Sequence, residues 1–266
     1  MTNTTKPTLM LIHGMWSQPW VWDNYRRFYE KAGYTVVVPT LRHHQSNADL
    51  TALGTTSIAD YVSDLAAEID QMPEKPVIIG HSLGGMLAQH LAALGKARAI
   101  GLISAAAPAP FFPIRLHSIP GTFLAFLKWA FWRKPMTLTR WSAKYAIFNA
   151  AAADQQKQLT EKLVPESGRA ASELVFGFIS RRNAAYCDIN DIQCPILSLA
   201  GKRDNIVPIQ VSRRLAKAYG AKMDYRELGQ HGHWMLGEDD WDYVANEVLA
   251  GVKQLDVEPQ RIAGQQ

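Results

Sequence analysis

The stretch Val77-Ile78-Ile79-Gly80-His81-Ser82-Leu83-Gly84-Gly85 joins a short apolar run to the start of a helical pattern. The apolar run follows Pro76 and predicts a buried β-strand, and the helical pattern, residues 83–94, ends before Gly95. Between them lies a Gly-x-Ser-x-Gly pentapeptide. A serine at such a strand-to-helix corner takes a strained backbone conformation, and the flanking glycines let strand and helix pack closely. We therefore predict that the hydroxyl of Ser82 points out of a sheet, above the carboxyl end of its strand.

Further short apolar runs recur toward both ends of the chain. They are Leu9-Met10-Leu11-Ile12, Thr35-Val36-Val37-Val38, Ile100-Gly101-Leu102-Ile103, Ile196-Leu197-Ser198-Leu199 and Met223-Asp224-Tyr225. Helical patterns separate these runs, over residues 22–31, 57–71, 83–94, 211–219 and 241–255. Continuous apolar strands, unlike alternating ones, indicate a parallel sheet covered on both faces. The sequence therefore predicts an α/β fold with a doubly wound, mostly parallel sheet and right-handed crossovers.

The middle of the chain breaks this alternation. Residues 105–192 begin with three prolines, contain no good buried-strand run and have mostly helical patterns. We therefore predict a core formed by residues 1–104 and 193–266, with a helical cap, residues 105–192, inserted between two sheet strands. This insertion holds 11 Lys and Arg against 6 Asp and Glu. A solvated basic face is the favoured interpretation, and contact with an anionic membrane surface is the alternative.

Composition excludes several classes of protein. The 266 residues carry a net charge of +4 and are 47% hydrophobic and 20% charged, which is typical of globular proteins. The chain contains no block of five or more like charges, so a nucleic-acid partner is not expected. Two cysteines, Cys187 and Cys194, are too few for a disulfide framework and favour a reducing compartment, so we expect a cytoplasmic protein. Residues 1–6 are polar and lack the apolar run of a signal peptide, so none is expected. The densest apolar stretch, residues 123–132, has about half the length of a membrane span, so a transmembrane segment is not expected either.

The Gly80-His81-Ser82-Leu83-Gly84-Gly85 motif resembles the nucleophile elbow of the α/β-hydrolases, and His13-Gly14 resembles their oxyanion loop. The resemblance extends from about Leu9 to Val252 and is weak in the insertion. It implies the α/β-hydrolase fold, in the serine esterase and lipase-like branch. A serine at the elbow argues against the haloalkane dehalogenase and epoxide hydrolase branches, which use an aspartate there, and against the cysteine-nucleophile branch.

The resemblance also implies that the catalytic acid follows the serine in the chain and precedes the histidine. Asp204 is the candidate, because it lies in the loop after the apolar run 196–199, at the same edge of the sheet as Ser82. Asp188 and Asp191 precede that run and are expected at the opposite edge. The alternative interpretation of Asp204 is a loop aspartate that caps the next helix.

The candidate base lies in the segment Gln230-His231-Gly232-His233-Trp234. Family members commonly carry a Gly-His pair here, followed by an apolar residue. This resemblance implies His233 as the base and leaves His231 as a loop histidine. An unassisted serine hydroxyl is a weak nucleophile. We expect His233 to take the proton of Ser82 and to pass it to the leaving group, while Asp204 fixes the histidine tautomer.

Two backbone N–H groups are implied as donors to the oxyanion. One belongs to Leu83, the residue after the nucleophile, and the other to Met15, the residue after His13-Gly14. We expect His13 to order its loop and not to act as a base. His43-His44 is expected to be a solvated loop pair, and it lacks further Cys, His or carboxylate residues at ligand spacing. The sequence therefore predicts no metal site.

Aromatic residues are frequent around the oxyanion loop and in the insertion. Most are expected to pack in the core or between helices, and the functional alternative is an apolar acyl cavity beneath the cap. The candidate substrate-binding residues are Trp16, Phe126 and Trp129.

These observations predict a cofactor-free serine hydrolase that cleaves carboxylic esters of small or medium acyl chains through an acyl-enzyme intermediate. The alternatives are a thioesterase, a lactonase, or a hydroxynitrile lyase or cofactor-free oxygenase on the same fold. Those lyases need a lysine near the catalytic histidine, and none stands beside His233. The expected partner is a small-molecule ester, and the sequence indicates neither the acyl chain length nor the oligomeric state.

Overall fold

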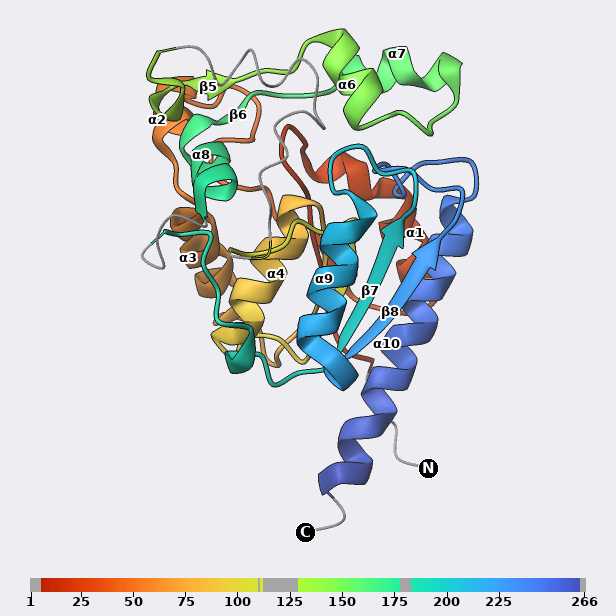
Figure 1. Cartoon of the computed structure of the whole chain (residues 1–266). Coiled ribbons are helices and arrows are strands. Elements are labelled where there is room, and N and C mark those ends of the chain that lie inside the picture. Colours follow the sequence, from red (N-terminus) through yellow and green to blue (C-terminus); the bar gives the residue numbers. More distant parts are fainter. Residues whose placement is uncertain (1–5, 110, 112–128, 178–182, 264–266) are drawn as a thin grey trace.

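The computed structural model describes residues 6–109, 111, 129–177 and 183–263, with side chains up to residue 254. Six strands form one sheet in the order β2-β1-β3-β4-β7-β8, and all neighbouring pairs are parallel (Figure 1). The strands are β1 (Leu9–Ile12), β2 (Val36–Val37), β3 (Val77–His81), β4 (Ala99–Ile103), β7 (Ile196–Gly201) and β8 (Met223–Leu228). The predicted doubly wound, mostly parallel sheet is confirmed.

Helices cover both faces of this sheet, which explains the continuous apolar runs. Every residue of β1, β3, β4 and β7 is buried. Tyr61 and Leu87 pack in the core on one face, and Tyr25 and Val248 pack in the core on the other. The first face is covered by α3 (Ile58–Ile69), α4 (Leu83–Ala93) and α9 (Ile209–Tyr219), and the second by α1 (Asp23–Lys31) and α10 (Trp241–Ala263).

Local signals account for most helix boundaries. Ser57 caps α3 in a capping box with Asp60, as the Ser-x-x-Asp spacing favours. The helix α2 (Leu50–Thr55) was not predicted, because it has six residues and an interior glycine. Short 3₁₀ helices, η1 (Pro19–Trp22) and η6 (Gly220–Lys222), precede α1 and β8. No helix in the described ranges is both long and apolar enough to cross a lipid bilayer.

The elements of the segment between β4 and β7 are η3 (Phe131–Arg133), β5 (Pro135–Met136), α6 (Arg140–Ala146), α7 (Ala153–Glu161), β6 (Glu166–Ser167), α8 (Gly168–Phe176) and η5 (Ile189–Asp191). In this segment, β5, β6, α6, α7 and α8 lie beyond the ends to which β7 and β8 point, whereas η5 lies toward the opposite end of the sheet, beside α4 (Figure 1). The sequence shows no good buried-strand run here, and the structure adds a short antiparallel pair formed by β5 and β6. This small sheet and α8 contact α2, so the segment is anchored on the chain between β2 and β3.

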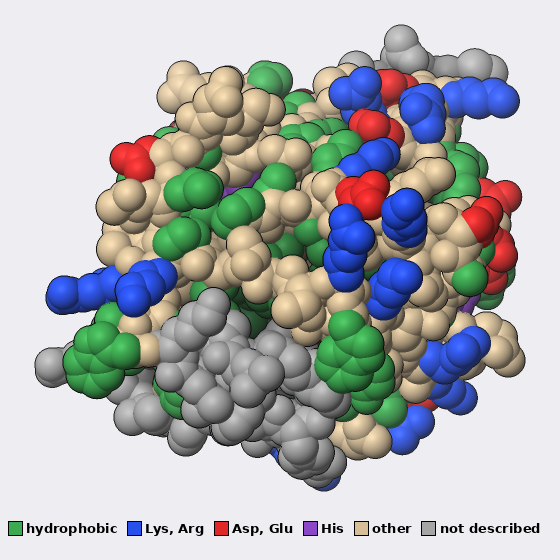
Figure 2. All heavy atoms as spheres, turned by 90° about the horizontal axis from the view of Figure 1, so that it is seen from above, with side chains coloured by type: hydrophobic (Ala, Val, Ile, Leu, Met, Phe, Trp, Pro, Cys, Tyr) green, Lys and Arg blue, Asp and Glu red, His purple; other side chains and the backbone are tan. Residues whose placement is uncertain are grey.

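The surface above the strand ends has a mixed character. Figure 2, which looks down on the inserted segment, shows Lys and Arg side chains grouped toward one side, with Asp and Glu among them. Exposed aromatic side chains of the same segment include Trp132, Trp141 and Tyr145, and the last two rings stack in parallel. Contact of this face with a membrane stays a prediction.

Candidate active site

Ser82 occupies a strained corner between β3 and α4. Its backbone angles are φ 53° and ψ −121°, in a region that residues other than glycine rarely adopt. A Cβ on Gly80 would lie 2.2 Å from the carbonyl oxygen of Gly84, and one on Gly84 would lie 2.1 Å from that of Ile12. Only glycine fits at either position, so the pentapeptide is explained by close packing of strand, helix and the end of β1.

The backbone around Ser82 is anchored on both sides. Its N–H donates to the carbonyl of Ile103 at 3.1 Å, and its carbonyl accepts from the N–H of Ala106 at 2.9 Å. Leu83 is the first residue of α4, so its N–H has no partner within the helix. A Cβ on Gly14 would lie 2.9 Å from that of Ser82, so the loop after β1 packs directly against the serine. The two N–H groups predicted to bind an oxyanion therefore belong to segments that flank Ser82.

His13 fixes the loop that follows β1. The N–H of Leu41 donates to Nε2 of His13 at 3.3 Å, so Nε2 carries no proton and the proton is on Nδ1. Nδ1 then donates to the carbonyl of Gly14 at 2.9 Å. Burial, together with the nearby His44, lowers the pKa of His13 to about 3, which keeps the ring neutral. This hydrogen bond orients the peptide that joins Gly14 to Met15, whose N–H is the predicted oxyanion donor.

Asp204 and His233 form a buried pair in the loops after β7 and β8. Oδ2 of Asp204 lies 2.8 Å from Nδ1 of His233. Oδ1 accepts from the N–H groups of Ile206 and Val207, each at 2.8 Å. Asp204 is 8% exposed and His233 is 3% exposed. The carboxylate is therefore held by two backbone donors and presents its second oxygen to the imidazole, an arrangement that orients a general base.

His81 joins the His233 loop to the serine corner. Nε2 of His81 lies 2.8 Å from the carbonyl oxygen of His233 and donates to it, and the two ring centres are 4.8 Å apart. Burial, and then the neighbouring His233, lower the pKa of His81 to about 3, so its ring is neutral. The sequence did not identify this contact, because the Gly-x-Ser-x-Gly motif leaves the residue before the serine unspecified. The segments that carry Ser82, His233 and Asp204 therefore meet at the carboxyl edge of the sheet.

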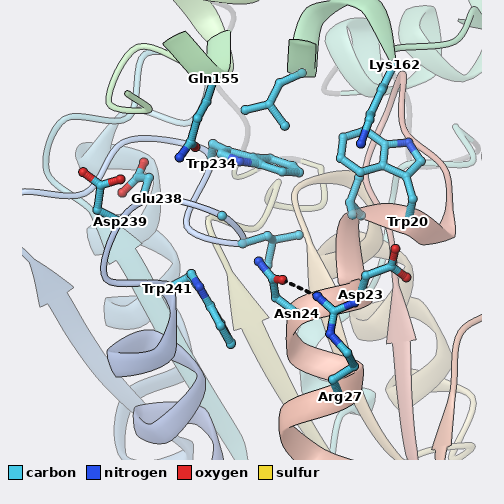
Figure 3. A pocket seen from close by; sticks show the side chains of 14 residues that line it. Trp20, Asp23, Asn24, Arg27, Gln155, Lys162, Trp234, Glu238, Asp239 and Trp241 are labelled. Carbon is cyan, nitrogen blue, oxygen red and sulfur yellow. Dashed lines mark hydrogen bonds between the residues drawn. The ribbon is translucent and has the colours of Figure 1, made fainter. Parts of the chain in front are cut away.

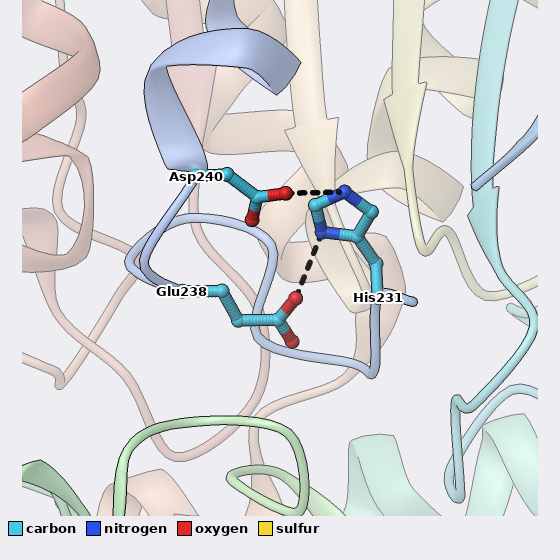
Figure 4. Close-up of side chains that lie close together, drawn as sticks. All are labelled: His231, Glu238 and Asp240. Carbon is cyan, nitrogen blue, oxygen red and sulfur yellow. Dashed lines mark hydrogen bonds and ion pairs between the residues drawn. The ribbon is translucent and has the colours of Figure 1, made fainter. Parts of the chain in front are cut away.

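His231 is buried between two carboxylates (Figure 4). Its Nδ1 lies 2.9 Å from Glu238 and its Nε2 lies 3.4 Å from Asp240. Burial lowers the pKa of His231, but the hydrogen bond that its ring donates to Glu238 and the charge of Asp240 outweigh this, and the net pKa is raised. Glu238 also accepts from the N–H of Gly232, and the carbonyl of His231 accepts from Arg203, which precedes the candidate acid. His231 thus joins the two loops that carry the candidate acid and the candidate base.

The expectation that His43-His44 forms a solvated pair is wrong for His44. Its side chain is fully buried and its Nε2 lies 3.2 Å from Oε2 of Glu166, also fully buried. Glu166 lies 122 residues away in β6, so the sequence offered no local signal for the contact.

The predicted substrate-binding residues differ in their surroundings. Trp16 is half-buried beside the oxyanion loop, and its indole N–H donates to the carbonyl of Met136 at 3.1 Å. Trp129 is 84% exposed and packs edge-on against Trp132. Phe126 lies outside the described residues. Substrate binding by these three side chains stays a prediction.

A pocket of about 410 Å³ lies beside residues 234–239, which follow His233 in the chain (Figure 3). It lies among α1, α7 and the start of α10, and Trp20, Trp234 and Trp241 line it together with polar side chains. Trp234 follows the candidate base directly, and its ring centre is 5.8 Å from that of Trp20. The ammonium of Lys162 lies over the Trp20 ring, 4.9 Å from its centre, in a cation–π contact.

Comparisons with known proteins show the family to which the chain belongs. Residues 9–247 match the model of the alpha/beta hydrolase family. A pimeloyl-[acyl-carrier protein] methyl ester esterase of Vibrio campbellii is 28% identical over 212 residues, which cover 79% of this chain and 81% of that protein. A methylesterase of Arabidopsis has a TM-score of 0.72 at 13% identity, covering 93% of this chain and 99% of its own. A monoacylglycerol lipase of Paleococcus ferrophilus has a TM-score of 0.71 at 22% identity, covering 93% and 94%. Because the family model spans most of the chain, the chain belongs to the alpha/beta hydrolase family.

Proposed function

We propose that this protein hydrolyses carboxylic esters of small or medium acyl chains, with Ser82 as nucleophile, His233 as general base and Asp204 as its orienting acid. The observation that carries the proposal is the buried hydrogen bond of 2.8 Å between Asp204 and His233, at the edge of the sheet where the strained Ser82 corner lies. Acyl transfer by a serine needs a nucleophile, a base beside it and a group that orients the base. Here the three candidates lie on separate loops at one edge of the sheet.

The reaction follows from the roles of these groups. His233 takes the hydroxyl proton as Ser82 attacks the ester carbonyl, and the N–H groups of Met15 and Leu83 stabilise the oxyanion. The tetrahedral intermediate collapses when His233 returns the proton to the leaving alcohol, which leaves an acyl-serine. Water then repeats the sequence with His233 as base, and the acid is released. Asp204 holds the ring in the tautomer that both steps need and stabilises the imidazolium.

The comparisons support an ester as the substrate. The relative from Vibrio campbellii is named as a methyl ester esterase, and the relatives of known structure include a methylesterase and a lipase. Residues 105–192 act in this proposal as a cap, because α6, α7 and α8 lie beyond the ends to which β7 and β8 point (Figure 1). Ser82 follows β3, a parallel strand of the same sheet, and so lies at this edge. The acyl chain is then bound between this cap and the sheet, with Trp16 beside the oxyanion loop.

The test is an activity panel of p-nitrophenyl esters of rising chain length, with a thioester and a lactone alongside. We expect turnover of acetate to octanoate esters above that of the thioester and the lactone. Ser82→Ala should reduce ester turnover to less than about one-thousandth, because triad members act as a unit. Ser63→Ala, on the exposed face of α3, is the matched control and should retain full activity. Ester turnover retained by Ser82→Ala would remove this serine from the nucleophile role.

A further inference from the structure

Trp16, the residue after the predicted oxyanion donor Met15, has an unfavourable backbone conformation. Its φ is 58°, in the left-handed region that bulky side chains avoid. Such a conformation persists only where surrounding contacts hold it. The carbonyl of Met15 accepts from the hydroxyl of Ser17 at 3.1 Å, which fixes one side of the peptide that joins Met15 to Trp16. The other side of this peptide is the N–H of Trp16.

The inserted segment holds Trp16 through three hydrogen bonds, two of which come from its small sheet. The backbone N–H of Trp16 donates to Oε2 of Glu166 in β6, at 3.4 Å. Its carbonyl accepts from the N–H of Val164 at 3.0 Å, and its indole N–H donates to the carbonyl of Met136 in β5. The backbone N–H and carbonyl of this strained residue are thus both bound by the segment between β4 and β7, which lies 120 to 150 residues away in the chain.

Glu166 is a fully buried carboxylate whose other contacts keep it charged. It accepts from the hydroxyl of Tyr61 at 2.8 Å and from the N–H of Ser167 at 2.6 Å. Its partner His44 faces the carbonyl of Arg42 with Nδ1 and Glu166 with Nε2, so both ring nitrogens donate and the ring is an imidazolium. Burial raises the pKa of Glu166, but the charge and the hydrogen bond of His44 outweigh this, and the net pKa is lowered. The N–H of Trp16 therefore faces a charged acceptor.

The same network acts on the second peptide beside Met15. The ring centre of His44 lies 5.3 Å from that of His13, and the charge of His44 disfavours protonation of His13. His13 must stay neutral to accept from Leu41 and to donate to Gly14. Glu166 thus binds the peptide between Met15 and Trp16 directly. His44 affects the peptide between Gly14 and Met15 indirectly, because it keeps His13 neutral and His13 donates to the carbonyl of Gly14.

We propose that Glu166 is a positioning residue for the oxyanion hole: from the inserted segment it fixes the Trp16 peptide and thereby aligns the N–H of Met15 with the tetrahedral intermediate. This inference rests on the proposed ester hydrolysis. It makes the inserted segment part of the catalytic arrangement, in addition to any role in covering the acyl chain. Glu166 touches no reacting atom and acts only through the loop that it holds.

The test compares Glu166→Gln with Glu173→Gln. Glu173 is a matched control, because it is also a buried carboxylate of the inserted segment, and it binds Ser57 and Ile58 at the start of α3, away from the oxyanion loop. Both variants lose one buried negative charge that joins the segment to the core. Kinetic constants are measured with p-nitrophenyl butyrate, and inhibition constants with a trifluoromethyl ketone, which forms a tetrahedral oxyanion on a serine, and with the butyrate product, which does not.

We expect Glu166→Gln to lower kcat about 10- to 100-fold with KM changed less than about twofold, below the 100- to 1000-fold that loss of a donor causes. Affinity for the ketone should fall by the same factor as kcat/KM, and affinity for butyrate should not. Glu173→Gln should leave all four constants within about twofold of wild type. An unchanged kcat, or a loss that appears in KM and in butyrate binding, would overturn the positioning role.

Tyr61→Phe provides the second variant in case Glu166→Gln does not fold. It removes one hydrogen bond to Glu166 and leaves the charge in place, so we expect a smaller fall in kcat, with a matching fall in ketone affinity. Unchanged kcat in a folded Tyr61→Phe protein would count against the proposal. Wild-type turnover is measured first. Absence of wild-type turnover across the ester panel would reject the proposed function itself. Wild-type turnover together with an unchanged kcat in Glu166→Gln would reject the positioning role alone.

Discussion

Asp204→Asn should abolish most activity while it preserves the fold, because the structure dictates which way the new amide points. Oδ1 of Asp204 accepts from two backbone N–H groups, those of Ile206 and Val207, at 2.8 Å each. An asparagine must place its carbonyl oxygen there, since an NH₂ group would face two donors. Its NH₂ group then takes the position of Oδ2 and points at Nδ1 of His233. Nδ1 can accept this hydrogen bond only if it carries no proton.

The neutral ring of His233 is thereby held with its proton on Nε2, where it cannot take the proton of Ser82. The same substitution in serine proteases lowers kcat about 10⁴-fold, which corresponds to roughly 5.5 kcal/mol of transition-state stabilisation. We expect a loss of that order in initial-rate assays with p-nitrophenyl butyrate at neutral pH. The free energy of unfolding in urea should change little, because both backbone hydrogen bonds remain. Asp191→Asn, in η5, is the control and should keep full activity. More than about one-hundredth of wild-type kcat in Asp204→Asn would refute the reasoning.

Three further predictions concern the histidines and the inserted segment. His233→Ala should cost about as much rate as Ser82→Ala, and His231→Ala at most a few-fold. The reverse order in parallel assays would show that the base is misassigned. The folded pKa of His231 is raised, so its contribution to stability is present below the unfolded pKa of about 6.5 and is lost as pH rises through the folded pKa. His231→Asn should therefore destabilise the protein more at pH 6 than at pH 9 in urea unfolding, and an equal loss at both would contradict the charged pair. Trp129→Ala should lower kcat/KM several-fold for octanoate and laurate esters and leave acetate unchanged, because each methylene contact is worth on the order of 1 kcal/mol. A uniform loss at every chain length would instead indicate a packing role.

The elements that local sequence could predict are those with a strong periodic or motif signal. The run Val77-Ile78-Ile79 became β3 because each side chain is buried between two layers of helices. Asp204 could be proposed because it follows the apolar strand β7, whose carboxyl end shares an edge with that of β3. His233 could be proposed because Gly232-His233-Trp234 resembles the Gly-His pair of the family, in the loop after β8. The strands β5 and β6 have two residues each, which is too short for any period to be visible.

The contacts that the sequence missed join distant segments through single polar side chains. Glu166 has no neighbours in sequence that mark it as an acceptor for Tyr61, His44 and Trp16, which precede it by 105, 122 and 150 residues. Glu238 is likewise an ordinary acidic residue until the loop places it against His231. A buried charge is stable only when it is paired and hydrogen-bonded, and that pairing is a property of the folded chain.

The histidines around the candidate site divide into two kinds by the partners that face them. His13 and His81 are buried, and each donates to a backbone carbonyl from one nitrogen, so burial dominates and both stay neutral with a pKa of about 3. His44 and His231 face the carboxylates of Glu166 and Glu238, so their pKa values are raised. His13 and His81 therefore hold their loops as neutral rings, and His44 and His231 hold theirs through carboxylate partners. In the proposed mechanism, the proton exchanged with Ser82 then moves only to and from the ring of His233.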